Sequence, residues 1–394
     1  MPVVVIGAGQ AGLAVSRGLS VRGVEHVVLE RARVAQAWRD RWDSFTLVTP
    51  NWTLGLPGSP YAGDDPEGHI DRDEIVAYFD GYAKQWAVPV REGVEVTGLG
   101  PGASTNFVLR TSDGDLSAEQ VVVCTGAFQR PHRPWQFSDL PVLDALDYRN
   151  PSSIGTGPVL VIGCGETGCQ IAEELRAEGR EVYLSCGRAP WFPRRLDGLD
   201  MVTWLHRIGF FEQRLSDIND GIRLLANPQY TGAGGGRDLN YRTLQEQGVR
   251  LVGHLEGVSG LEARFSDDLA ASVAFGDARW ADVRGLLAAK LPGFGYEVPE
   301  MLPPPPFDPG EPVASLDLSG FAAVIVAAGF RPDYSWIDFP IFDSVGYPVT
   351  VDGAVVEVPG LYFCGVHFMR VRRSGFVFGV GDDAELVAEA VASR

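Results

Sequence analysis

Two glycine-rich stretches decide the fold: VVVIGAGQAGLAV (residues 3–15) and VLVIGCGETGCQIAEEL (residues 159–175). Each joins a short apolar strand to a helix through a GxGxxG turn, and a second apolar strand follows. The first glycine permits a tight turn, the second lets a pyrophosphate approach the backbone, and the third lets helix and strand pack closely. Amide groups and the dipole of the helix N-terminus favour the phosphate. The sequence therefore predicts an α/β fold with two Rossmann-like dinucleotide-binding units.

The first unit contains the turn Gly7, Gly9, Gln10, Ala11 and Gly12, a helix to about residue 22 and a strand over residues 26–30. Glu30 closes this strand. A carboxylate at that point accepts hydrogen bonds from the ribose hydroxyls of an adenosine. The alternative interpretation is a glycine-rich turn that binds no nucleotide.

The second unit contains the turn Gly163, Gly165, Glu166, Thr167 and Gly168, a helix to about residue 177 and a strand over residues 181–185. No carboxylate closes this strand. Arg188 follows it, with Arg194 and Arg195 a few residues on. Arginine can bind a 2′-phosphate bidentately, whereas an acid would repel it, so the second unit is predicted to bind NADPH. The alternative for Arg188 is an ordinary surface arginine.

Composition narrows the class of protein. A chain of 394 residues exceeds the size of one growing core, which predicts two domains. The net charge of −18 argues against nucleic acid and anionic membranes as partners. No long apolar run or basic leader is present, so a cytoplasmic protein is expected. The five cysteines and six histidines lack metal-ligand or CxxC spacing, which argues against a metal site and against disulfide-reductase chemistry.

The order of the segments predicts one domain inserted in another. Helices are expected over residues 72–86, 197–207 and 237–247, with short strands near Val94, Phe107 and Val121 and further strands over residues 249–275. After a proline run, the apolar stretch FAAVIVAAGF (residues 321–330) returns the chain to a buried sheet. We therefore expect an outer domain of residues 1–153 plus 320–394 and an inner domain of residues 154–319.

Several further motifs carry a family resemblance. They are AWRDRWDSFTLVTPNW (37–52), CTGAFQRPHRP (124–134), GRDLN (236–240), AAGFRPDYSWID (327–338) and GLYFCGVHFMRVRRSGFVFGVGDDAE (360–385). In this order, the sequence resembles the class B flavoprotein monooxygenases, and within them the CzcO-like branch of the flavin-containing monooxygenase family. The resemblance implies a glutathione-reductase-like flavoprotein with FAD on the first loop and NADPH on the second. It also implies reduction of dioxygen to a C4a-hydroperoxyflavin that transfers one oxygen atom.

The resemblance also implies site residues. Pocket candidates near the flavin are Arg39, Asn51, Trp52 and His367. Candidate FAD contacts, besides the first loop and Glu30, are Trp38, Arg39, Trp42, Thr49, Val96, Thr125, Gly126 and Asp382. Asp382 and Asp383 are expected in the first turn of the last helix, where carboxylates favour the helix dipole.

Three departures from the family pattern stand out. The fingerprint FxGxxxHxxx(Y/F) corresponds here to residues 137–151, with Asp139 at the glycine, Asp144 at the histidine and Tyr148 retained. Pro50 replaces the asparagine that usually follows the threonine, and the usual glycine pair before Trp38 is replaced by Ala35 and Gln36. These changes put efficient coupling of the two half-reactions in question without removing either nucleotide site.

The leading hypothesis is an FAD- and NADPH-dependent monooxygenase that acts on a small organic molecule, at a soft nitrogen or sulfur or beside a carbonyl. A second hypothesis is an NADPH oxidase or dehydrogenase without oxygen transfer, and a third is a nucleotide-binding redox sensor. The expected partners are the organic substrate and dioxygen, and a homodimer is left open.

Overall fold

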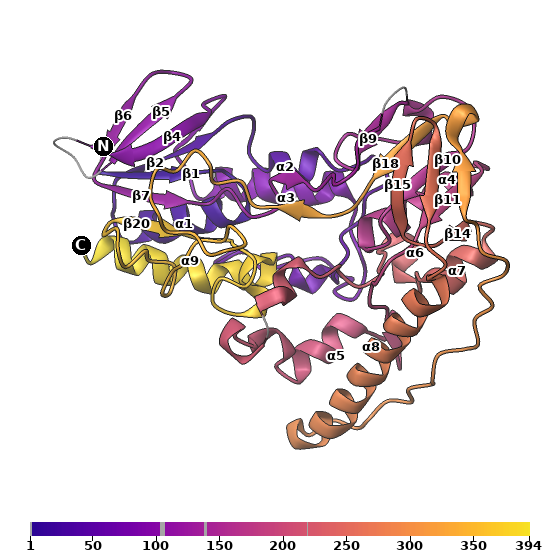
Figure 1. The fold of residues 1–394 in the computed structure, drawn as a ribbon. Helices are drawn as coiled ribbons and strands as arrows, with labels where there is room; N and C mark the ends of the chain where they lie inside the picture. The colour runs from indigo at the N-terminus through magenta and orange to yellow at the C-terminus, as the bar shows by residue number, and fades with distance from the viewer. Residues whose placement is uncertain (1, 103–106, 138–139, 219) are drawn as a thin grey trace.

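Two five-stranded parallel sheets, one in each half of the molecule, organise the chain (Figure 1). The computed structural model describes residues 2–102, 107–137, 140–218 and 220–394. The first sheet has the order β20-β7-β1-β2-β3 and the second has the order β14-β11-β10-β18-β9. Their strands are β1 Val3–Ile6, β2 His26–Glu30, β3 Val90–Glu92, β7 Gln120–Val123 and β20 Leu361–Phe363, then β9 Val142–Asp144, β10 Val159–Ile162, β11 Val182–Ser185, β14 Arg250–Val252 and β18 Ala323–Val326.

Both predicted strand-turn-helix units are confirmed. α1 (Gln10–Val21) follows β1 and α4 (Glu166–Ala177) follows β10. β1 and β10 are fully buried, as expected for central strands of parallel sheets covered on both faces. α9 (Val377–Ala392) packs so closely on α1 that a Cβ at Gly18 would lie 2.8 Å from the Cβ of Ala388.

The second sheet takes strands from outside the expected inner domain. β18 pairs with β10, from Val159–Ala323 to Ile162–Val326, and β9 pairs with β18. The stretch 321–330 therefore returns the chain to the second sheet, and not to the first as the expected range 320–394 implied. The chain passes between the halves through β8 (Arg130–Pro131) and β19 (Phe330–Arg331), which pair antiparallel.

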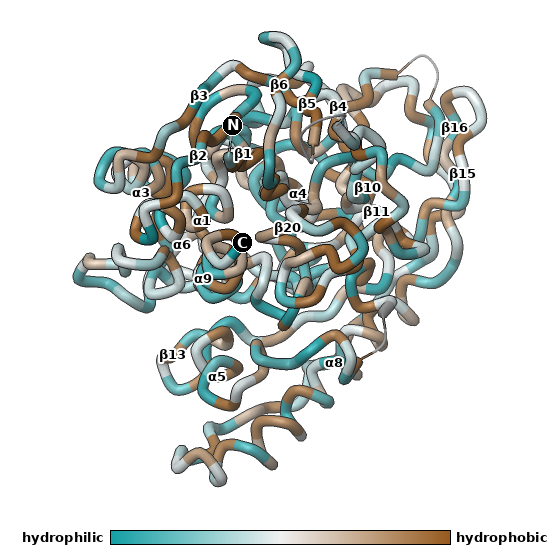
Figure 2. The backbone as a smooth tube through the Cα atoms, turned by 90° about the vertical axis from the view of Figure 1, so that its left-hand side faces the viewer, coloured by the Kyte–Doolittle hydropathy of each residue, from teal (hydrophilic) through white to brown (hydrophobic). Residues whose placement is uncertain are grey.

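α8 (Leu269–Lys290) was not predicted, and the strands expected up to residue 275 end at Phe265. Leu269, Val273, Trp280 and Leu287 are buried at helical spacing, so this segment follows a 3.6-residue period. Figure 2 shows polar and apolar residues alternating along α8, which projects with α5 (Met201–Arg207) at one end of the molecule. No helix within the described ranges is long and apolar enough to cross a membrane.

Apart from α3, the remaining elements are short. The other α-helices are α2 Gln36–Arg39, α3 Arg72–Gln85, α6 Ala233–Gly236 and α7 Tyr241–Glu246. The other strands are β4 Val96–Pro101, β5 Phe107–Thr111, β6 Leu116–Ala118, β12 Arg195–Leu196, β13 Leu199–Asp200, β15 Leu255–Ser259, β16 Glu262–Phe265 and β17 Ser315–Asp317. The 3-10 helices are η1 Asn51–Thr53, η2 Pro151–Ser153, η3 Phe210–Glu212, η4 Leu215–Asp217, η5 Asp220–Leu224, η6 Leu291–Phe294, η7 Leu318–Gly320 and η8 Arg372–Gly375.

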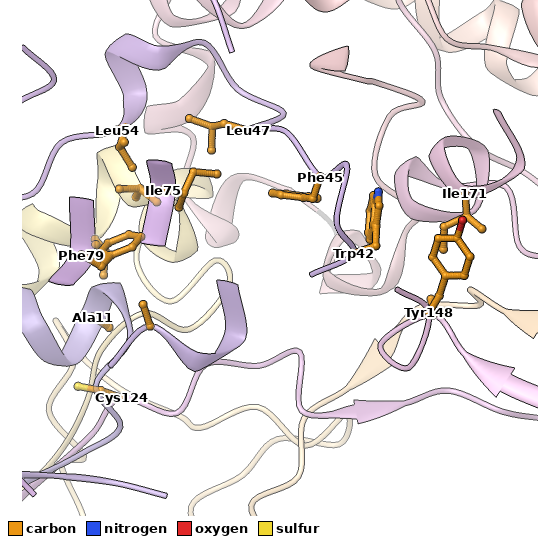
Figure 3. Close-up of a cluster of buried hydrophobic side chains, with 14 of the residues drawn as sticks. Ala11, Trp42, Phe45, Leu47, Leu54, Ile75, Phe79, Cys124, Tyr148 and Ile171 are labelled. Carbon is orange, nitrogen blue, oxygen red and sulfur yellow. The ribbon is translucent and has the colours of Figure 1, made fainter. Parts of the chain in front are cut away.

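One apolar cluster runs from the first half into the second. Figure 3 shows Ala11 and Cys124 at one end of it, and Trp42, Tyr148 and Ile171 at the other. Tyr148 is fully buried, and its hydroxyl donates to Glu174 of α4 at 2.7 Å. Ser44 donates to the other oxygen of the same carboxylate at 2.7 Å. Glu174 therefore ties a first-half loop and the segment after β9 to α4.

Candidate functional site

The first glycine loop leaves room for a ligand at one position only. A Cβ at Gly7 would lie 2.8 Å from the Cys124 carbonyl oxygen, and one at Gly12 would lie 1.9 Å from that of Gly7. These two glycines are therefore required by the chain's own packing. A Cβ at Gly9 would have no heavy atom within 4 Å, and Gly9 has an ordinary φ of −81°. Since neither packing nor conformation requires glycine there, the site fits a pyrophosphate lying against the backbone.

The second glycine loop repeats this arrangement. A Cβ at Gly163 would lie 2.4 Å from the Ala327 carbonyl oxygen, and one at Gly168 would lie 1.8 Å from that of Gly163. At Gly165, where φ is −70°, the nearest atom would lie 3.7 Å away. Both loops thus carry the same cradle for a dinucleotide, one in each half of the molecule.

Glu30 is fixed beside the first loop. Its carboxylate is 8% exposed and accepts the backbone N–H of Ala8 at 2.8 Å and that of Ala32 at 3.0 Å. These bonds hold the side chain at the carboxyl end of β2. A carboxylate in that place fits the predicted contact with a ribose.

Arg188 is exposed at the carboxyl end of β11, and no ion pair or hydrogen bond of its side chain occurs among the described residues. Thr167 and Glu166 begin the second turn's helix nearby. Burial raises the pKa of the Glu166 carboxyl, against the opposing effect of a hydrogen bond from Asn227. The unpaired guanidinium of Arg188 is therefore available to a ligand phosphate.

A cavity of about 530 Å³ opens beside the second loop. It is lined by His132, Pro134, Trp135, His254, Leu255, Glu256 and Ala328. A Cβ at Gly187 would lie 3.7 Å from His254 Nδ1, and one at Gly163 would lie 3.1 Å from Ala328 N. The cavity therefore adjoins the glycine turn and Gly187, the residue before Arg188. Neither Trp135 nor His254 was predicted as a site residue, because neither belongs to a spaced motif.

Arg194 differs from its expected role as a phosphate ligand. Its side chain is 1% exposed and lies 2.7 Å from the carboxylate of Asp200. It also donates to the Val48 carbonyl and stacks over Tyr230, 4.8 Å from the ring centroid. Arg194 therefore joins the two halves, because its buried guanidinium binds Asp200 and a carbonyl of the first half. Unlike Arg188, it is not available to a ligand.

The amide of Gln10 links the first loop to the C-terminal segment. Gln10 Nε2 donates to the Gly375 carbonyl at 2.9 Å, and Gln10 Oε1 accepts from the indole N–H of Trp38 at 3.2 Å. A Cβ at Gly365 would lie 2.5 Å from the Cβ of Ala11, so the end of β20 also meets the loop. Trp38 thus lies against the first loop, and its contact with FAD stays a prediction. Gly365 and Gly375, which also meet the loop, were not predicted.

Four other first-half candidates are engaged with the protein itself. Arg39 donates to both oxygens of Asp80 at 2.6 and 2.7 Å, and Thr49 Oγ1 lies 2.6 Å from Thr53 Oγ1. Trp42 is 4% exposed and packs edge-on to Phe45. Val96 is half-buried at the start of β4. These contacts fix the shape of residues 34–53.

Asn51 is likewise satisfied by the protein. It is 3% exposed, its amide donates to the Asp65 carbonyl at 2.9 Å, and its oxygen accepts from the Ile70 backbone at 2.7 Å. The structure therefore gives Asn51 a role in holding the loop of residues 61–70. It does not present Asn51 as a replacement for the asparagine that Pro50 displaces.

Thr125 and Gly126 lie where the chain leaves the first sheet. Gln129 Nε2 donates to Thr125 Oγ1 at 2.8 Å and to the Gly126 carbonyl at 2.9 Å, and the Tyr334 hydroxyl donates to the same carbonyl at 2.8 Å. These bonds join the two segments that cross between the halves.

The prediction for Asp382 and Asp383 is wrong in its geometry. α9 begins at Val377, so neither carboxylate lies in its first turn. Asp382 is exposed and pairs with Arg373 at 2.7 Å, whereas Asp383 is 1% exposed and pairs with Arg370 at 2.7 Å. The first turn is apolar, and both carboxylates balance arginines of the preceding loop.

Trp52 and His367 belong to one aromatic cluster. We define this cluster as Trp52, Phe128, His206, Phe210, Phe211, His367, Phe368, Phe376 and Phe378. Trp52 lies 4.9 Å from His206 and 5.6 Å from Phe378, and His367 lies 4.7 Å from Phe368. The Trp52 indole also donates to Thr203 of α5 at 2.9 Å. Residues from both halves therefore meet at this cluster.

His367 is neutral near pH 7. Burial, with the neighbouring cations of Arg223 and Arg372, lowers the pKa of the His367 imidazole to about 4. No hydrogen bond of its ring nitrogens occurs among the described residues. The ring can therefore donate or accept a hydrogen bond toward a ligand.

The altered fingerprint lies in the segment between the halves. Asp139 is outside the described residues. Asp144, at the histidine position, pairs with Arg133 at 2.9 Å. Tyr148 keeps its place and binds Glu174, as described above. Asp144 thus holds β9 to the crossing segment by an ion pair.

All five cysteines are free and buried. Cys169 donates to the Cys164 carbonyl at 3.2 Å, and the Cys164 sulfur accepts the Gly187 N–H at 3.0 Å. Burial raises the pKa of both thiols. Within the described ranges, no group of three or more His, Cys, Asp or Glu side chains is arranged to hold a metal ion.

A family model described as pyridine nucleotide-disulphide oxidoreductase matches residues 4–227. This chain belongs to the pyridine nucleotide-disulphide oxidoreductase family. Within that family it is 32% identical over 397 residues to the uncharacterized oxidoreductase CzcO-like of Geobacillus kaustophilus, covering 97% of this chain and 96% of that protein. Indole-3-pyruvate monooxygenase YUCCA1 of Oryza sativa is 31% identical over 188 residues, covering 45% of each chain.

Among solved structures, the flavin-containing monooxygenase from Stenotrophomonas maltophilia matches with a TM-score of 0.69 at 21% identity, covering 100% of this chain and 98% of that one. The matches confirm the expected fold of two dinucleotide-binding units and the CzcO-like branch of the flavin-containing monooxygenase family. This family member is a flavin-dependent oxidoreductase that uses FAD and NADPH. The disulphide of the family name has no counterpart in its five free cysteines.

Proposed function

We propose that the protein is an FAD-dependent, NADPH-consuming monooxygenase that transfers one oxygen atom from dioxygen to a small organic substrate. The observation that carries this proposal is the pair of loop positions Gly9 and Gly165, one in each half, where a Cβ would meet no protein atom closer than 3.7 Å. Two redox nucleotides on one chain permit internal hydride transfer when the halves face one another. The contacts of Arg194 with Val48 and of Trp52 with Thr203 join the halves where such a transfer would occur.

Each nucleotide has its proposed holders. The first loop and Glu30 would hold FAD, and the second loop and Arg188 would hold NADPH, with the cavity beside Trp135 and His254 receiving part of it. When bound, FAD supplies hydride acceptance and activation of dioxygen. The residues of the chain bind, orient and exclude water.

The aromatic cluster would form the wall that keeps water from the reacting atoms. Its rings come from η1, the segment between β7 and β8, α5, η3, the segment before α9 and the first turn of α9, so both halves contribute to it. A water-excluding site strengthens the electrostatic interactions inside it and suppresses loss of peroxide. His367, held neutral, would offer a hydrogen bond without adding a charge.

Three kinds of oxygen transfer are compatible with this proposal: transfer to nitrogen, transfer to sulfur and insertion beside a carbonyl. The similarity to the rice indole-3-pyruvate monooxygenase, which is named for a 2-oxo acid, favours reaction beside a carbonyl.

A second candidate is an NADPH oxidase without oxygen transfer. The observation in its favour is Asp144, paired with Arg133, at the place of the fingerprint histidine. An altered connection between the halves would leave the reduced flavin open to water and release peroxide instead of oxygenating a substrate.

Measurement of hydrogen peroxide distinguishes the monooxygenase from the oxidase. The holoenzyme is mixed with NADPH and oxygen, and the peroxide released per NADPH consumed is measured with and without amines, thioethers, ketones and aromatic 2-oxo acids. A monooxygenase gives a ratio that falls when its substrate is present. A ratio near one with every compound supports the oxidase, and oxidised flavin after anaerobic mixing with NADPH overturns both.

A further inference from the structure

The loop before α9 is rich in arginine, and most of these cations are balanced. Arg370 lies 2.7 Å from Asp383, and Arg373 lies 2.6 Å from Glu212. Arg223, which approaches the same loop from η5, lies 3.0 Å from Asp343 and donates to the Phe368 carbonyl. Each of these three guanidinium groups therefore has a carboxylate partner in the protein.

Arg372 lacks such a carboxylate. Within the described ranges its guanidinium makes no ion pair, and one nitrogen, Nη2, donates to Gln213 Oε1 at 2.7 Å. The Nε atom is buried without a hydrogen-bond partner. The guanidinium lies 4.2 Å from the ring centroid of Phe210 and 4.9 Å from that of Phe368. Burial lowers the pKa of Arg372 to about 10, which still leaves it charged near neutral pH.

The positive charge of Arg372 is only partly compensated, because its neighbours are one neutral amide and two aromatic rings. Aromatic faces attract a guanidinium, but less strongly than a carboxylate does. A planar guanidinium with free N–H groups also matches a carboxylate geometrically, because the two can form parallel hydrogen bonds. The group that would complete this site is therefore an anion supplied from outside the chain.

Arg372 lies at the edge of the aromatic cluster. Phe210 and Phe368 both belong to the cluster, and the Phe368 ring lies 4.7 Å from His367. We propose that Arg372 anchors the carboxylate of a flat aromatic substrate whose ring packs in the aromatic cluster. This inference rests on the proposed function and names its substrate class, an aromatic carboxylic acid.

The same charges would select against amines. Glu212, Asp343 and Asp383 are each paired with an arginine, so they offer a substrate ammonium no unpaired carboxylate. Arg372, which makes no ion pair among the described residues, would repel an ammonium. The site therefore discriminates by charge sign as well as by shape.

Equilibrium binding tests the inference independently of turnover. Phenylpyruvate and its methyl ester are titrated against the oxidised holoenzyme, and the change in flavin absorbance gives each Kd. The acid and the ester differ in charge while keeping the same ring. We expect the native protein to bind the acid at least tenfold more tightly than the ester, and Arg372→Met to lose that preference while binding the ester unchanged.

Two further variants complete the test. Arg372→Gln keeps a donor toward Gln213 without the charge, and should lose the preference as Arg372→Met does. Arg279→Met, which removes an arginine stacked on Phe275 of α8, is the matched control and should keep it. FAD content and the melting temperature of each variant report folding.

The outcomes are distinct. An acid preference that survives in folded Arg372→Gln overturns the inference, as does a native protein that binds acid and ester equally or binds neither. If the acid preference depends on Arg372 but no product is oxygenated, the anion site stands and the proposed monooxygenase function fails.

Discussion

Gln10, the first residue of α1, donates a hydrogen bond of 2.9 Å to the carbonyl of Gly375, 365 residues further along the chain. This bond fastens the loop that carries His367 and Arg372 to the predicted FAD cradle. A nucleotide bound at the first loop and a substrate bound at the aromatic cluster would thus share one rigid support.

The open position at Gly9 gives the most direct test of the FAD cradle. Replacing Gly9 by valine should leave the apoprotein folded, because a Cβ there meets no protein atom within 4 Å, while FAD content falls at least tenfold. Flavin absorbance per protein after dialysis measures the loss. Gly81→Val in α3, where a Cβ likewise meets no protein atom within 4 Å, serves as the comparison, and a fully loaded Gly9→Val protein would contradict the cradle.

Arg188 should set the preference between the two pyridine nucleotides. Arg188→Ala removes an exposed guanidinium without a protein partner, so stability should change by less than about 0.5 kcal/mol. The KM for NADPH should rise at least tenfold and the KM for NADH should change little, because only NADPH carries the 2′-phosphate. Equal increases for both nucleotides would rule out a contact with that phosphate.

Arg194 should behave in the opposite way. Arg194→Met leaves Asp200 buried without its cation, and losing one partner of a buried pair costs about 3–5 kcal/mol. Denaturant unfolding should therefore show a large loss of stability. The ratio of KM values for NADPH and NADH should stay close to that of the native protein. A stable variant with an altered preference between the two nucleotides would instead support the predicted contact of Arg194 with NADPH.

The difference between Arg188 and Arg194 shows which features of the site can be predicted from the sequence and which cannot. The glycine turns at Gly7 and Gly163 predict their strands and helices, because the spacing itself encodes the close packing of turn, strand and helix. Arg188 and Arg194 are equally plausible phosphate ligands in the sequence. Only the fold brings Val48 and Asp200 to Arg194 and so commits it to the interface.

Other features were missed for similar physical reasons. The helix α8 was not predicted, although its buried residues Leu269, Val273, Trp280 and Leu287 follow the helical period. Trp135 and His254 meet only in the folded protein, 119 positions apart in the chain. Asp383 pairs with Arg370 and Asp382 pairs with Arg373, although both carboxylates were predicted to lie in the first turn of the last helix.

The lowered pKa of His367 predicts a pH-dependent stability. In the unfolded chain this imidazole titrates near 6.5, and in the folded protein near 4, so the unfolded state binds more protons between these values. The folded protein should therefore lose stability as the pH falls through this window. The loss is at most about 3 kcal/mol, because solvent screens the charge of a half-buried ring. Unfolding free energies of the native protein and of His367→Phe, compared from pH 7 to pH 4, isolate this contribution. If both fall in parallel, His367 is not held neutral by the fold.

The fate of molecular oxygen tests the central claim most directly. The holoenzyme is incubated with NADPH, ¹⁸O₂ and phenylpyruvate or another accepted substrate, and the products are analysed by mass spectrometry. The account predicts one ¹⁸O atom in the organic product for each molecule formed, with the second atom released as water. Product without the label, or label recovered only in hydrogen peroxide, would contradict it.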